Sequence, residues 1–185
     1  MVGALWTGIS GLGGSQQGLD NESNNIANVN TIGFKSSRVS FADQMYQDKI
    51  GKGVTSFDVE KLYTQGNLKN TGVSYDMALS GDGFFQVKDG NAKFLIGKIL
   101  PMNFTNVSGL NPEGDNLYTQ GVDQKDPFYI EGAATVEGKY LEKSNIDLSE
   151  TLVNLMVWQK AFDANSKTVT TSDELLKTAL ALKTS

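Results

Sequence analysis

The sequence predicts an α+β fold with a long helix at each end and a mainly β middle. Apolar residues recur at alternating steps of four and three near both termini, and strand and turn signals fill the segment between them. All three prolines and the whole net charge of −5 fall within residues 41–138. We therefore divide the chain into residues 1–36 and 139–185, the two halves of a helical inner domain, and residues 37–138, a linker and β-rich outer or middle domain.

The first helix is expected over residues 4–29. Its apolar positions follow the a and d spacing of a heptad repeat, which favours packing against another helix. Six glycines between Gly3 and Gly18 make this segment a poor helix alone, at about 1 kcal/mol each relative to alanine, but they let a neighbouring backbone approach closely. The helix is expected to stop by Gly33, which can adopt a left-handed conformation. The heptad positions are Leu5, Ile9, Leu12, Gln16, Leu19, Ser23 and Ile26.

The second helix is expected over residues 147–183. Asp147 is a suitable N-cap, and Glu150 three residues later completes a variant of the capping box. An ordinary amphipathic helix on a globular core is the alternative, but a period near 3.5 favours a seam between helices. We take the heptad positions of both helices as candidate contacts between helices or subunits. In the second helix these candidates are Leu148, Leu152, Leu155, Gln159, Phe162, Ser166, Val169, Leu176 and Leu180; the heptad series also includes Asp173, which is not one of the candidates.

The middle of the chain carries alternating apolar and polar residues punctuated by turn signals. Asp89-Gly90-Asn91 predicts a hairpin turn, and residues 111–116 are predicted to form a loop. Residues 37–47 fit either a short helix or an extended linker. The predicted strands are 54–63, 73–79, 84–87, a pair within 92–106, and 135–140.

Composition argues against most catalytic and binding chemistries. The chain has no Cys and no His, which removes thiolate zinc sites, disulfides and the commonest general base. A net charge of −5 with Arg38 as the single arginine does not suit a nucleic-acid partner. The glycine run at 8–14 lacks the spacing of a phosphate loop, and the acids of the middle segment do not match a calcium loop. We expect no enzymatic activity, cofactor or metal.

No apolar stretch reaches the roughly 18 residues that a membrane span needs, so we expect no membrane insertion. The N-terminus also lacks the basic and apolar regions of a secretory signal peptide.

Four asparagines crowd the end of the first helix. Asparagine is a weak helix former because its side chain competes for backbone hydrogen bonds, so the cluster helps to end the helix. Four such residues in seven exceed what termination needs. We therefore take Asn24, Asn25 and Asn28 as candidate contacts to neighbouring subunits.

Four blocks in order along the chain resemble the bacterial flagellar rod and hook protein family. They are NNIANVNTIGFK at 24–35, SGDGFF at 80–85, NFTN to GDNLY at 103–118, and SNIDL to DELL at 144–176. Residues 154–157 and 164–167 resemble the hook members more than the distal-rod members.

The resemblance implies a subunit that leaves the cell unfolded through the flagellar export apparatus and polymerises helically into a tube. It implies that the two terminal helices pair as an antiparallel coiled coil in the inner layer, with the β middle outside. The expected partners are copies of the chain itself, neighbouring axial proteins (rod, hook cap and hook–filament junction) and the export apparatus. Hook proteins carry large outer domains. In this chain, residues 90–98 lead directly into sequence that resembles the part of hook proteins that follows those domains.

The function expected from the resemblance is that of a subunit of the extracellular flagellar hook, a flexible coupling that transmits motor torque to the filament. Two alternatives stay open. One is a distal-rod subunit of the flagellar basal body, which acts as a drive shaft. The other is a non-enzymatic binding module with a helical stalk.

Both heptad series contain polar positions in the same order, which predicts a register for antiparallel pairing. Polar residues at a and d positions disfavour slipped registers, in which they would face apolar partners. The predicted facing pairs are Gln16–Ser166, Ser23–Gln159, Leu19–Phe162, Leu12–Val169, Ile26–Leu155 and Leu5–Leu176.

Overall fold

The computed structural model describes residues 2–46, 50–85, 102–114, 116–120, 128 and 134–183. The predicted turn at 89–91, the direct passage at 90–98 and most of the predicted strand pair at 92–106 lie outside the described residues. The chain forms two compact units. The helical unit comprises Met1–Ala27, Ser37–Leu62 and Ile146–Ser185, and the β unit comprises Asn28–Ser36 and Tyr63–Asn145. Residues 37–62, which we expected in the middle domain, therefore pack with the helices.

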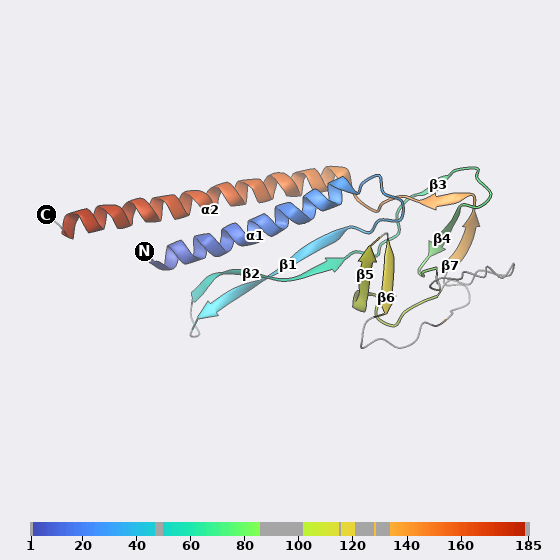
Figure 1. Ribbon diagram of the computed structural model, residues 1–185, viewed down its shortest axis with the longest axis horizontal. Coiled ribbons are helices and arrows are strands. Elements are labelled where there is room, and N and C mark those ends of the chain that lie inside the picture. The colour runs from blue at the N-terminus through green and yellow to red at the C-terminus, as the bar shows by residue number, and fades with distance from the viewer. Residues whose placement is uncertain are drawn as a thin grey trace. The chain divides into compact units, whose positions relative to one another are not determined.

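Two long helices dominate the helical unit, as the sequence predicts. Helix α1 (Val2–Ala27) and helix α2 (Leu148–Lys183) lie side by side and run antiparallel (Figure 1). Asp147 caps α2 as expected, because its carboxylate accepts hydrogen bonds from the backbone N–H groups of Ser149 (2.9 Å) and Glu150 (3.3 Å). The α+β fold with paired terminal helices is confirmed.

Helix α1 ends earlier than the glycine signal indicates. The chain turns at Asn28, where the Thr31 N–H donates to the Asn28 carbonyl oxygen (3.1 Å) and the Thr31 hydroxyl donates to Asn28 Oδ1 (3.1 Å). Gly33 does adopt a left-handed conformation (φ 68°), but in a later turn whose N–H donates to the Glu142 carbonyl oxygen. Asparagine competition for the backbone therefore ends the helix before the glycine does.

A β-hairpin completes the helical unit. Strand β1 (Ser37–Tyr46) and strand β2 (Ile50–Lys61) pair antiparallel, so the segment that the sequence left undecided is a strand. The hairpin packs along α1 (Figure 1). The Phe41 ring of β1 contacts the Trp158 ring of α2, with ring centroids 5.3 Å apart.

The β unit consists of three antiparallel strand pairs among its described residues. Strand β3 (Leu68–Asn70) pairs with β8 (Tyr140–Glu142), β4 (Met77–Gly81) with β7 (Ala134–Gly138), and β5 (Leu110–Gly114) with β6 (Leu117–Gln120). A short 3₁₀ helix, η1 (Val107–Gly109), precedes β5. The predicted loop at 111–116 is wrong, because most of it is strand β5. Pro112 is tolerated there because, among the described strands, β5 pairs with β6 alone, and Asn116 (φ 58°) lies in the turn before β6.

An aromatic cluster joins segments of the β unit that are distant in sequence. Tyr63 contacts the rings of Phe84 and Tyr118, and Phe84 also contacts the rings of Phe104 and Tyr118, at centroid distances of 5.6–6.0 Å. Such edge-to-face contacts add to the free energy gained from burying the rings. Burial raises the pKa of Tyr63 to about 12, and the neighbouring Tyr118 adds to that rise.

Candidate functional site

One row of α1 faces α2 and is made of very small residues. This glycine row consists of Gly8, Gly11, Ser15 and Gly18. A β-carbon at Gly18 would lie 2.5 Å from the Trp158 ring, and one at Gly8 would lie 2.9 Å from Val169 Cγ2. Carbon atoms that are not bonded normally stay about 3.5–4.0 Å apart. The two helices therefore approach at a distance that only small side chains on α1 permit.

The register of the helix pair is not the one that the sequence analysis predicts. Gly8 lies opposite Val169 and Gly18 opposite Trp158, a shift of about five residues from the expected alignment. This register places Ser166 near Gly11 rather than opposite Gln16. Gln16 is exposed, and its side-chain amide donates to Asp20 on its own helix (3.0 Å). The glycine row, rather than the polar heptad positions, sets the alignment.

The candidate residues of α1 divide by position around the helix. In the single chain, the row spaced by seven is half-buried and the alternate row is exposed. The half-buried residues are Leu5, Leu12, Leu19 and Ile26, and the exposed ones are Ile9, Gln16 and Ser23; Asn24, which lies outside both rows, is also exposed.

The candidate residues of α2 divide in the same way. Those nearer α1 are half-buried: Leu155, Phe162, Ser166, Val169 and Leu176. Those that face away are exposed: Leu148, Leu152, Gln159 and Leu180. Asp173, the remaining heptad position, is also exposed and forms an ion pair with Lys177 on the same helix (2.7 Å).

The N-terminal half of α2 carries a broad outward apolar face. We call it the outward face, and its members are Leu148, Leu152, Val153, Met156 and Val157, each between 45% and 58% exposed. On α1, Trp6 and Ile9 are also exposed. Contiguous apolar surface of this kind on a helix typically marks a site of protein–protein contact.

The asparagine cluster acts partly within the chain. Asn25 is buried, and its amide group bonds both backbone groups of Ser37, with Nδ2 donating to the carbonyl oxygen (2.8 Å) and Oδ1 accepting from the N–H (3.0 Å). Asn21 Nδ2 donates to the same carbonyl oxygen (2.7 Å). Asn28, as described above, accepts from Thr31. Asn25 therefore fastens the start of the hairpin to α1, whereas Asn24 remains exposed.

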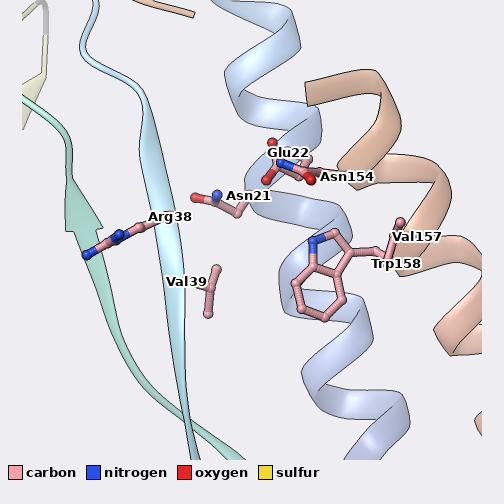
Figure 2. A pocket seen from close by; sticks show the side chains of 7 residues that line it. All are labelled: Asn21, Glu22, Arg38, Val39, Asn154, Val157 and Trp158. Atoms are coloured by element: carbon pink, nitrogen blue, oxygen red, sulfur yellow. The ribbon is translucent and has the colours of Figure 1, made fainter. Parts of the chain in front are cut away.

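A small pocket opens where α1, α2 and β1 meet. Its volume is about 200 Å³, and its lining residues are Asn21, Glu22, Arg38, Val39, Asn154, Val157 and Trp158 (Figure 2). Burial raises the pKa of Glu22 above its ordinary value; a hydrogen bond from Asn25 partly offsets this, and repulsion from Glu150 adds to it. We call this cavity the Glu22 pocket.

The sequence analysis missed the role of Trp158 and Asn165, which lie on α2 opposite the glycine row. The signal was present in the glycines, since Gly8, Gly11, Ser15 and Gly18 have heptad spacing of their own. The search for apolar positions missed this row because it does not count glycine, and because the neighbouring row carries an apolar heptad pattern.

Two further findings concern the described residues. They contain no group of three or more acidic, histidine or cysteine side chains placed to hold a metal ion. No helix among them has both the length and the apolar character to cross a membrane.

Both helical ends of the chain match known protein families. Residues 137–182 match the family described as flagellar basal body rod FlgEFG protein C-terminal. Residues 5–35 match the family described as flagella basal body rod protein. These segments contain most of α1 and nearly all of α2.

Curated relatives extend the likeness to nearly the whole chain. The flagellar basal-body rod protein FlgG of Buchnera aphidicola (subspecies Acyrthosiphon pisum) is 30% identical over 255 aligned positions, which cover 96% of this chain and 98% of that protein. FlgG of Bacillus subtilis is 28% identical over 99% of this chain and 100% of that protein. The flagellar hook protein FlgE of Helicobacter mustelae is 41% identical, but over 50% of this chain and 24% of that protein.

The rod alignments are longer than the 185-residue chain, so they contain gaps on this side. The likeness nevertheless reaches from one helical end to the other and includes the β unit between them. The chain therefore belongs to the flagellar basal-body rod and hook protein family, and it is a non-enzymatic structural subunit of the bacterial flagellar axis.

Proposed function

We propose that the chain is a subunit of the basal-body rod, of the distal-rod type, and that it polymerises with copies of itself into a tubular drive shaft. The observation that supports this assignment is the fraction of each protein that the alignments cover. The rod relatives align with nearly all of this chain and nearly all of their own length, whereas the hook relatives align over about half of this chain. The hook, which the sequence analysis favoured, becomes the second candidate.

The hook remains a candidate because of one specific observation. Over the part that aligns, the hook relatives from Helicobacter are 41% and 44% identical to this chain, more than the rod relatives are over the whole length. Those matches cover 24% and 14% of the hook proteins. A hook subunit would place the chain in the extracellular flexible coupling rather than in the basal body.

The surface that we assign to polymerisation combines the outward face of α2 with the exposed heptad positions of α1. Full burial of a leucine or methionine side chain contributes about 1.5–3 kcal/mol. Several such side chains lie within the few turns of the outward face. Copies of the chain that cover this face would gain that free energy at every subunit of the polymer.

The remaining proposed partners follow from the same placement. A rod subunit meets other axial proteins at each end of its own segment, and it reaches that position through the flagellar export apparatus. The hook cap and the hook–filament junction would be neighbours only if the second candidate is correct.

Electron microscopy of basal bodies from a strain that lacks the gene separates the two candidates. For a distal-rod subunit we expect basal bodies whose rods are truncated and which carry no hook. For a hook subunit the rods would be complete and end where the hook should begin, and that result would contradict the rod assignment. Expression of the gene from a plasmid should restore the missing part in either case.

A further inference from the structure

The Glu22 pocket has the volume and the mixed apolar and polar lining that suit a lysine side chain. The Trp158 ring and the side chains of Val157 and Val39 supply the apolar part of the lining, and Glu22, Asn154 and Asn21 supply polar groups (Figure 2). Lysine has an alkyl stem that can lie along apolar surface and a charged head that needs polar groups. A volume of about 200 Å³ accommodates such a chain.

The charges around the pocket favour a cation. Glu22 accepts a long hydrogen bond from Asn25 (3.4 Å), and among the described residues it forms no ion pair. Glu150 lies near enough to repel it. The one cation in the lining, Arg38, points away from the helices toward β2 (Figure 2), where its Nε and Nη2 donate to Glu60 Oε2 at 3.1 and 2.9 Å. Because Glu60 balances Arg38, the two carboxylates of Glu22 and Glu150 set the sign of the pocket.

A second copy of the chain can supply the cation. Lys160 and Lys167 are exposed on α2 and, within the described part of the chain, neither forms an ion pair. Lys160 follows Met156 and Val157 by about one turn, so it continues the outward face that we assign to polymerisation. At 100° per residue it lies about 120° around the helix from Asn154 and about 160° from Trp158, and therefore points away from both of these lining residues; Val157, about 60° from Lys160, lies at the edge that the pocket shares with the outward face.

We propose that the Glu22 pocket receives the side chain of Lys160 or Lys167 from helix α2 of a second copy. The proposal rests on the proposed polymerisation and names one contact within it. Each subunit would offer a lysine on one surface and a pocket on another. Contacts of this head-to-tail kind do not close on themselves in pairs, and they propagate as rings or open helices.

Charge reversal tests the contact through the critical concentration for assembly, measured by sedimentation. We expect Glu22→Lys to raise that concentration about tenfold or more, since close charge pairs at interfaces are often worth a factor of ten. Glu22→Gln should raise it less. The matched control is Glu137→Lys in the β unit, which changes net charge equally and should alter assembly by less than about twofold.

Rescue identifies the donor. Lys160→Glu or Lys167→Glu should impair assembly alone and restore it when combined with Glu22→Lys. If Glu22→Lys assembles like Glu137→Lys, or if neither lysine reversal restores assembly to Glu22→Lys, the proposal is overturned. Circular dichroism of each unassembled variant establishes that the helices still form.

A second measurement uses the unmutated chain. Zero-length carbodiimide cross-linking of polymers made from mixed heavy- and light-isotope subunits, followed by mass spectrometry, should yield a mixed-isotope amide between Glu22 and Lys160 or Lys167. Cross-links at other carboxylates with none at Glu22 would overturn the proposal. A chain that forms no polymer at all would instead contradict the proposed function.

Discussion

Asn25 serves as a strand partner for the first residue of the hairpin. Its amide presents one donor and one acceptor to the N–H and carbonyl oxygen of Ser37, much as a neighbouring strand would. The carbonyl oxygen has Asn21 as a second side-chain donor, whereas Asn25 is the side-chain acceptor for the N–H. The sequence analysis predicted that Asn25 contacts a neighbouring subunit, but its amide group bonds Ser37 of its own chain.

Asn25→Ala should lower the free energy of unfolding of the helical unit by about 1–3 kcal/mol, the cost of leaving a buried N–H without an acceptor. Asn21→Ala should cost less, because the Ser37 carbonyl oxygen keeps its bond from Asn25. The exposed Ser23→Ala is the control and should stay within about 0.5 kcal/mol of the unmutated chain. Urea unfolding followed by circular dichroism measures all three. Equal stability of Asn25→Ala and Ser23→Ala would show that the Asn25 contacts contribute nothing.

The raised pKa of Tyr63 predicts that the β unit loses stability at alkaline pH. Its pKa is about 12 in the folded protein against an ordinary value of 10.0, so the folded state holds the phenolic proton more tightly than the unfolded chain does. The resulting stabilisation is complete below pH 10 and is lost as the pH rises from about 10 to about 12. Tyr63→Phe should weaken this pH dependence, measured as the melting temperature against pH. If Tyr63→Phe and the unmutated chain lose the same stability at alkaline pH, titration of Tyr63 is not the cause of that loss.

At the scale of elements, the glycine row decides how the two helices meet. Gly13 lies on the same helix but has open space around it, whereas Gly18 lies directly against Trp158. Both glycines cost the same in helix propensity, so a comparison of the two separates propensity from packing.

Gly13→Ala should stabilise the helical unit by up to about 1 kcal/mol through helix propensity alone. Gly18→Ala gains the same propensity but forces a methyl group into the Trp158 ring, and overpacking of this kind typically costs about 1–3 kcal/mol. We therefore expect opposite signs from the same substitution, read as shifts in thermal melting temperature. Stabilisation of similar size in both variants would contradict the close approach of the helices.

The same elements show what the sequence could and could not predict. Heptad spacing and the Asp147 cap are local signals, and they predicted α2 almost to the residue. The register depended on which row of α1 faces α2. That row is made of glycine and serine, whose contribution is the absence of side-chain volume, so a search for apolar positions selected the neighbouring row.

Segments whose conformation depends on distant partners were the hardest to predict. Strand β1 exists because β2 pairs with it and because Phe41 packs on Trp158 and against Gly14. Neither condition is visible within residues 37–47. The Glu22 pocket escaped the sequence analysis for the same reason, since its lining comes from α1, β1 and α2.

At the scale of the whole molecule, the fold leaves the proposed polymerisation surface uncovered. Helix α1 packs against α2 through the glycine row and also contacts the hairpin, whereas the outward face of α2 is exposed in the single chain. Leu155 and Phe162 are half-buried, so substitution there would disturb the helix pair as well as any assembly. Leu152 and Met156 are the better probes, because they are about half exposed.

The central claim is that copies of the chain assemble through the outward face of α2, and sedimentation with electron microscopy of the purified subunit tests it most directly. The unmutated chain should form tubes above a critical concentration. Leu152→Asp combined with Met156→Asp should abolish them, because each interface would bury two unpaired carboxylates at a cost of several kcal/mol. Ser74→Asp combined with Ser108→Asp, two exposed changes in the β unit that add the same charge, should leave assembly intact. Tubes formed by the double variant at the concentration that the unmutated chain requires would contradict the claim.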